Sequence, residues 1–123
     1  MRPLRSRRPV RAIALPLLAG CFSGDPAPAE PPPPTPPITA TVVGNANANT
    51  FSPQTVTIAR GGSVTWQVST RPHNVAFVGA TGAPANVPTG TNYEVARAFP
   101  TAGTFAYACT LHAGMIGTVV VRE

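Results

Sequence analysis

The stretch TVTIARGGSVTWQVS, residues 55–69, decides the fold. Two short runs rich in Val, Ile, Thr and Trp flank the sequence Arg-Gly-Gly at residues 60–62. β-Branched and aromatic residues favour strands, and paired glycines favour a tight turn. We therefore predict strands over Gln54–Ala59 and Ser63–Ser69, joined by a hairpin turn.

The same pattern continues through residues 38–123, where no apolar residues recur at helical spacing. Further strands are predicted over Thr39–Val43, Asn74–Val78, Asn92–Phe99, Gly103–Ala108 and Gly117–Arg122, and a long loop over Gly79–Gly90. About seven or eight short strands with regular turn signals predict an all-β fold, an antiparallel Greek-key β-sandwich. Its expected core consists of aromatic and branched apolar residues, namely Val56, Ile58, Val64, Trp66, Val75, Phe77, Phe99, Phe105, Val119 and Val121.

The first twenty residues have the pattern of an export signal. An Arg-rich start leads into AIALPLLAG, residues 12–20, which is much shorter than the roughly 20 apolar residues that span a bilayer. The ending LLAGC resembles a bacterial lipoprotein signal, which implies a signal peptide over residues 1–20 and lipidation of Cys21. An ordinary secretory peptide, with APA at residues 27–29 as another cleavage sequence, is the alternative. SRR at residues 6–8 hints at twin-arginine export.

A proline-rich segment separates this leader from the strand-rich region. Residues 22–37 hold eight of the sixteen prolines, which favour an extended polyproline II conformation. At about 3.1 Å per residue this segment can reach roughly 50 Å. We therefore predict a lipid-anchored cysteine and linker over residues 21–37 and a globular domain over residues 38–123, displayed on the periplasmic side of the cell envelope.

The charge distribution argues against a nucleic-acid partner. The formal net charge is +5, but five of the nine basic residues lie within the first eleven positions. The rest of the chain carries four basic and four acidic residues, so no basic patch is expected on the domain.

The cysteine, histidine and methionine side chains form a small set. Besides Cys21 and the leader, the chain has Cys109, His73, His112 and Met115, three of them within the stretch YACTLHAGMIG at residues 107–117. A thiolate, two imidazoles and a weak axial thioether suit copper that alternates between Cu(I) and Cu(II). Zinc is the chemical rival, although it prefers a fourth strong ligand or a water. The alternative without a metal is a buried free cysteine, two surface histidines and a core methionine.

The domain resembles the cupredoxins, the small blue copper proteins. The resemblance is carried by FSPQTVTIARGGSVTW at residues 51–66, HNV at residues 73–75 and YACTLHAGMIGTVVV at residues 107–121. The Cys-x2-His-x2-Met spacing is similar to the short loop of amicyanin.

This resemblance implies a site for one type 1 copper ion. His73, Cys109 and His112 would be the equatorial ligands and Met115 the axial ligand. Asn74 would brace the metal-binding loop through a hydrogen bond near Thr110, as metal sites require of the residues around their ligands.

The implied function is that of a membrane-tethered, monomeric one-electron carrier rather than an enzyme. The electron would pass through the edge of His112, over an apolar surface that includes Ala113 and Gly114. The expected partners are redox proteins, such as a cytochrome and a membrane oxidase or reductase. A copper chaperone of the cell envelope and a structural sandwich with a vestigial site are the alternatives.

Overall fold

The computed structural model describes residues 20, 24 and 26–123. The predicted signal peptide, apart from Gly20, and the predicted lipidation site Cys21 lie outside the described residues. None of the described segments forms a helix long and apolar enough to cross a membrane. Residues Pro33–Glu123 form one compact unit, which carries all the elements below.

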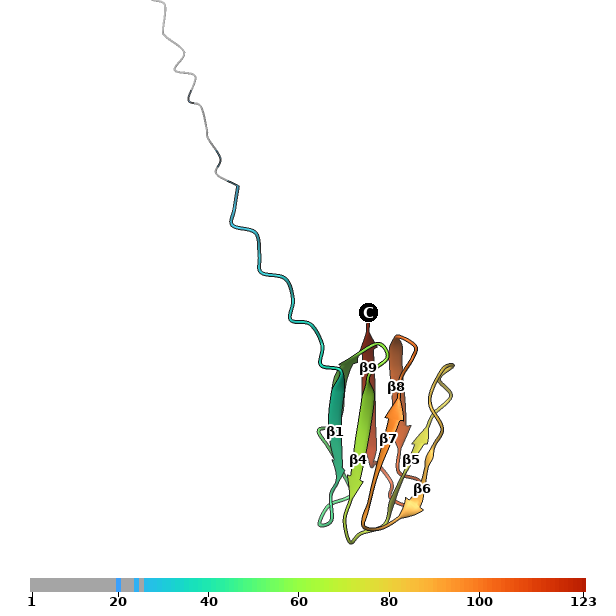
Figure 1. Cartoon of the computed structure of the whole chain (residues 1–123). Coiled ribbons are helices and arrows are strands. Elements are labelled where there is room, and N and C mark those ends of the chain that lie inside the picture. Colours follow the sequence, from blue (N-terminus) through green and yellow to red (C-terminus); the bar gives the residue numbers. More distant parts are fainter. Residues whose placement is uncertain (1–19, 21–23, 25) are drawn as a thin grey trace, which may run out of the picture. The chain divides into compact units, whose positions relative to one another are not determined.

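In the described part of the chain this unit consists of nine strands in two sheets and contains no helix (Figure 1). One sheet has the order β2-β1-β4-β7 and the other the order β3-β9-β8-β5-β6. The strands are β1 (Thr39–Gly44), β2 (Phe51–Ser52), β3 (Thr55–Ala59), β4 (Ser63–Val68), β5 (His73–Phe77), β6 (Val87–Gly90), β7 (Tyr93–Ala98), β8 (Gly103–Ala108) and β9 (Ile116–Arg122).

The all-β sandwich is confirmed, and each of the seven predicted strands appears with ends that agree within one residue. Two short strands were missed, β2 and β6, and β6 occupies part of the segment predicted as a long loop. β6 contains Pro88 and pairs only with β5, with a register shift between His73 and Val75. An edge strand tolerates proline because one side of its backbone needs no partner, and such a strand has a weak sequence signal.

Strand pairing differs from the prediction in two respects. β1 pairs with β4 and β3 pairs with β9 in parallel, so both sheets are mixed rather than wholly antiparallel. The predicted turn at residues 60–62 exists, with Gly61 at φ 82°, but it connects strands of different sheets and closes no hairpin. Both differences have one cause, because β3 and β4 pair with strands distant in sequence, which local patterns do not specify.

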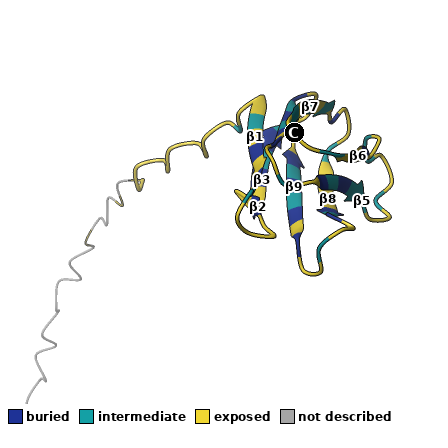
Figure 2. Cartoon of the chain, turned by 90° about the horizontal axis from the view of Figure 1, so that it is seen from below, coloured by how far each residue is buried: buried dark blue, intermediate teal, exposed yellow. Residues whose placement is uncertain are grey.

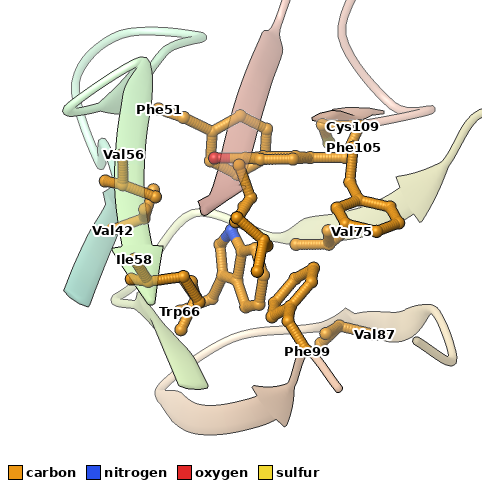
Figure 3. Close-up of a cluster of buried hydrophobic side chains, with 14 of the residues drawn as sticks. Val42, Phe51, Val56, Ile58, Trp66, Val75, Val87, Phe99, Phe105 and Cys109 are labelled. Atoms are coloured by element: carbon orange, nitrogen blue, oxygen red, sulfur yellow. The ribbon is translucent and has the colours of Figure 1, made fainter. Parts of the chain in front are cut away.

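The core lies between the two sheets and is rich in aromatic rings. Strand residues alternate between buried and more exposed positions, as the period of two in a β-strand requires (Figure 2). Trp66 lies in the middle of the cluster, with ring centroids of Phe77 and Tyr107 at 5.9 and 5.4 Å (Figure 3). The predicted core residues are buried, except Phe77, which is partly buried and packs against them. Val42, Phe51, Val87, Tyr107, Cys109 and Met115 complete the cluster.

The strand directions separate the two ends of the sandwich. β9 begins at Ile116, directly after the loop formed by residues 109–115, and ends at Arg122, beside Ala59 of its parallel partner β3. The Ala59 N–H donates to the Pro37 carbonyl, so the proline-rich residues join the sandwich at this end. Seven strand residues at about 3.3 Å each place the 109–115 loop roughly 20 Å away, at the opposite end (Figure 1).

Candidate metal site

Two separate parts of the chain bring the candidate side chains together. His73 is the first residue of β5, and Cys109 directly follows β8. The 109–115 loop is closed by backbone hydrogen bonds, because Cys109 N–H donates to the Met115 carbonyl at 2.9 Å and Met115 N–H donates to the His112 carbonyl at 3.2 Å. Gly114 has a φ of 76°, which a glycine adopts without steric cost, and this lets the chain reverse within the five residues between Cys109 and Met115.

The three strongest candidate ligand atoms form a compact triangle. Cys109 Sγ lies 3.6 Å from His112 Nδ1 and 3.9 Å from His73 Nδ1, and all three ligand atoms lie within 4.8 Å of one another. Metal–ligand distances of about 2.0–2.3 Å require the corners of a trigonal site to lie roughly 3.5–4 Å apart. The two separations from Cys109 Sγ therefore fit a single first-row metal ion held between the three residues.

Three of the four candidate ligands are buried, and the fourth is partly exposed. His73, Cys109 and Met115 are each at most 3% exposed, whereas His112 is partly exposed. Cys109 forms no disulfide within the described part of the chain. The structure brings Met115 to the same end by the backbone bond to Cys109, and its side chain packs in the core cluster.

The contacts of His73 fix which of its nitrogens faces the sulfur. Nε2–H donates to the Asn45 carbonyl at 3.0 Å, which leaves Nδ1 unprotonated and directed toward Cys109. Gly44 lies against the ring, since a Cβ there would be 2.9 Å from His73 Cδ2. Tyr93 O–H donates to the His73 carbonyl at 3.1 Å. The sequence carries no signal for the contacts of Asn45, Gly44 and Tyr93, because they depend on how distant segments meet.

Asn74, next to His73, connects β5 to the 109–115 loop. Its Oδ1 accepts from Thr110 N–H at 2.8 Å, and its Nδ2 donates to Thr110 Oγ1 at 2.7 Å. Nδ2 also donates to Thr89 Oγ1 at 3.1 Å. Sequence reasoning missed Thr89 because β6 was predicted as loop, so nothing placed it beside β5.

Charges and burial around the triangle shift three pKa values. Partial burial, together with the positive charge of Arg71 and the charge that His73 would carry when protonated, lowers the pKa of His112 and favours the neutral imidazole that a metal requires. Burial and the negative charge on Cys109 raise the pKa of Tyr93. Burial raises the pKa of Tyr107 to about 12.

A β-sandwich that gathers two imidazoles, a thiol and a thioether at one end has the features of a type 1 copper protein. Residues 38–122 match the family of copper binding proteins described as plastocyanin/azurin, and the chain belongs to that family. Its cofactor is copper, and the function of its class is copper electron transfer.

Individual relatives agree with this assignment. Plastocyanin from Scenedesmus fuscus is 33% identical over 102 residues, which cover 69% of this chain and 99% of that protein. A solved amicyanin variant is 29% identical with a TM-score of 0.58, covering 68% of this chain and 82% of the other. A copper-containing nitrite reductase from Thermus scotoductus is 23% identical with a TM-score of 0.57, covering 74% of this chain and 23% of that one, and this likeness shows the fold alone.

Proposed function

We propose that the protein is a membrane-tethered, monomeric carrier of single electrons, with one type 1 copper ion held by His73, Cys109, His112 and Met115. The observation that carries this proposal is the triangle of two histidine nitrogens and one Sγ, two of whose residues are buried and whose ligand atoms already lie within 4.8 Å of one another. Copper supplies the chemistry by alternating between its Cu(I) and Cu(II) states. The residues supply a fixed geometry, which reduces how far the ligands must move in each electron transfer.

Several contacts support a rigid site. Backbone hydrogen bonds close the 109–115 loop, and Asn74 holds Thr110, the residue after Cys109, by two hydrogen bonds. The Asn45 carbonyl holds the ring of His73. Deep burial of Cys109 and Met115 restricts the access of a substrate to the ion, which supports a carrier over an enzyme.

The proposed route for the electron is the partly exposed edge of His112. Leu111, next to His112 in the chain, is 47% exposed, and Ile116, which follows the 109–115 loop, is 53% exposed; Ala113 and Gly114 are exposed as well. We propose that a cytochrome, or a membrane oxidase or reductase, docks on this apolar surface. Association through an apolar surface depends only weakly on salt, because few charges are screened.

Electron self-exchange between oxidised and reduced copies tests this docking surface without a known partner. We expect Leu111→Glu to slow self-exchange, because a charge in the apolar contact must be desolvated. Val78→Glu is the matched control, since Val78 is 64% exposed and follows the end of β5 remote from His73. Equal rates for the two variants would contradict docking at His112.

The tether is proposed from the lipoprotein-like LLAGC sequence and from the position of the linker. Residues 33–38 join the sandwich at the end opposite to the 109–115 loop. In a bacterial host, we expect the native protein to fractionate with membranes and Cys21→Ser to remove it from them. A native protein found only in the soluble fraction would refute the anchor.

Copper handling is separated from electron transfer by repeated redox cycling with an excess of a Cu(I) chelator. A carrier retains its ion, so the visible spectrum returns after each reoxidation. Transfer of the ion to the chelator upon reduction would favour a chaperone instead.

A further inference from the structure

We propose that Thr89 is a positioning residue of the metal site, acting through Asn74 on the loop that carries Cys109. The inference rests on the proposed function, which makes Cys109 a copper ligand. Thr89 belongs to the edge strand β6, far in sequence from both segments that supply the candidate ligands. Its Oγ1 accepts a hydrogen bond from Asn74 Nδ2 at 3.1 Å.

The orientation of the Asn74 amide follows from its partners. The Thr110 backbone N–H can only donate, so the atom that it meets at 2.8 Å must be the amide oxygen. The two hydrogens on Nδ2 are then taken by the hydroxyl oxygens of Thr89 and Thr110. The terminal torsion of asparagine has broad energy minima, so these partners, and not the side chain itself, determine the orientation of the amide.

Thr89 is needed because the Asn74 contacts are exposed to water. Water competes for the amide hydrogens, and a hydrogen bond in such a position adds little by itself. Thr110 belongs to the loop that must be held, whereas Thr89 belongs to a sheet. Asn74 itself belongs to β5, so Thr89 adds the neighbouring strand β6 to the support of the loop, and without Thr89 the Asn74 amide keeps side-chain partners only on Thr110.

β6 is fixed firmly enough to serve as that support. Val87 is buried in the core, and β6 pairs with β5 at Val75 and His73. Just before β6, Arg97 of the opposite sheet donates from Nε to the Ala85 carbonyl at 2.9 Å and from Nη2 to the Asn86 carbonyl at 3.0 Å. Asn86 Oδ1 accepts from Phe77 N–H at 2.9 Å. Contacts to both sheets therefore hold the backbone that presents Thr89.

Amide hydrogen exchange of the copper-free protein tests the positioning directly. Thr89→Val keeps the shape of the side chain and removes the hydroxyl acceptor, whereas Thr89→Ser keeps the acceptor. Loss of one net hydrogen bond is expected to accelerate exchange of the Thr110 N–H about two- to tenfold in Thr89→Val, with rates near the native value in Thr89→Ser. Thr89→Ala removes the hydroxyl without putting a methyl group in its place and must accelerate exchange as well.

The copper-loaded variants give a second readout. We expect Thr89→Val to shift the thiolate-to-copper charge-transfer band and to lose copper to a chelator about two- to tenfold faster, with native values in Thr89→Ser. Thr91→Val, at an exposed threonine just beyond β6, is the matched control and should resemble the native protein.

A native rate of Thr110 N–H exchange in Thr89→Val would overturn the inference. So would Thr89→Ser or the control Thr91→Val showing the same changes as Thr89→Val. Failure of the proposed function looks different. In that case the native protein gives no charge-transfer band, while exchange of the Thr110 amide in the copper-free variants still reports whether Thr89 positions the loop.

Discussion

Replacing Tyr107 by phenylalanine removes a hydroxyl from the interior while keeping the ring. Tyr107 is 1% exposed, and its ring centroid lies 5.0 Å from that of Phe51 and 5.4 Å from that of Trp66. Neither Tyr107 O–H nor Trp66 Nε1–H meets hydrogen-bond geometry with any partner among the described residues. Phenylalanine therefore preserves the packing and removes no hydrogen bond from the described structure.

The pKa of Tyr107 determines how strongly the free energy of unfolding depends on pH through this residue. Burial raises the pKa of Tyr107 from 10.0 to about 12, and the nearby indole of Trp66 offsets only part of this rise. Between these values the unfolded chain has lost the proton that the folded chain retains, so the free energy of unfolding falls as pH rises. At about pH 11 the native protein is expected to have lost about 1.4 kcal/mol through this group.

Urea unfolding of the copper-free protein, followed by Trp66 fluorescence, measures this loss. The stability of Tyr107→Phe minus that of the native protein should be constant up to about pH 9 and should then grow by about 1.4 kcal/mol near pH 11. Because all other titrating groups are shared, the difference isolates Tyr107. A stability difference that stays constant through this pH range would refute the reasoning.

Further predictions concern the packing and charge around the site. Gly44→Ala places a Cβ 2.9 Å from His73 Cδ2, so we expect a loss of about 1–3 kcal/mol in urea unfolding and weaker copper binding, and native values for both would contradict the contact. Gly117→Ala places a Cβ 2.7 Å from Tyr107 Cε2 and should lower the free energy of unfolding by a similar ~1–3 kcal/mol. A variant whose midpoint of thermal unfolding equals that of the native protein would exclude this clash. In an NMR titration of the copper-free protein, His112 should titrate below its ordinary pKa of 6.5, and Arg71→Gln should raise that midpoint. An unchanged midpoint in Arg71→Gln would show that its charge does not act on His112.

Most strands could be predicted from local sequence because their residues alternate over several positions. TVTIA in β3 and SVTWQV in β4 each place apolar residues on one face, as a strand buried on one side requires. β6 could not be predicted this way, since VPTG has one buried residue and depends on β5 for its pairing. The parallel pairing of β3 with β9 is equally invisible locally, because it joins residues about sixty positions apart.

The chemistry of the site was visible in the sequence, but its support was not. A chain with so few soft side chains reveals the set that suits copper by composition and spacing alone. The partners that orient this set are ordinary residues. The Asn45 carbonyl and the Thr89 hydroxyl matter only because segments distant in sequence meet at one end of the sandwich, and no property of asparagine or threonine in the sequence indicates this.

Titration of the purified protein with Cu(II) tests the central claim most directly. We predict an intense visible charge-transfer band that saturates at one equivalent, is abolished in Cys109→Ser, and is retained in Met115→Leu with a shifted reduction potential. A protein that stays colourless at saturation, or that binds zinc as tightly through the same residues, would contradict the assignment of an electron-transfer copper site.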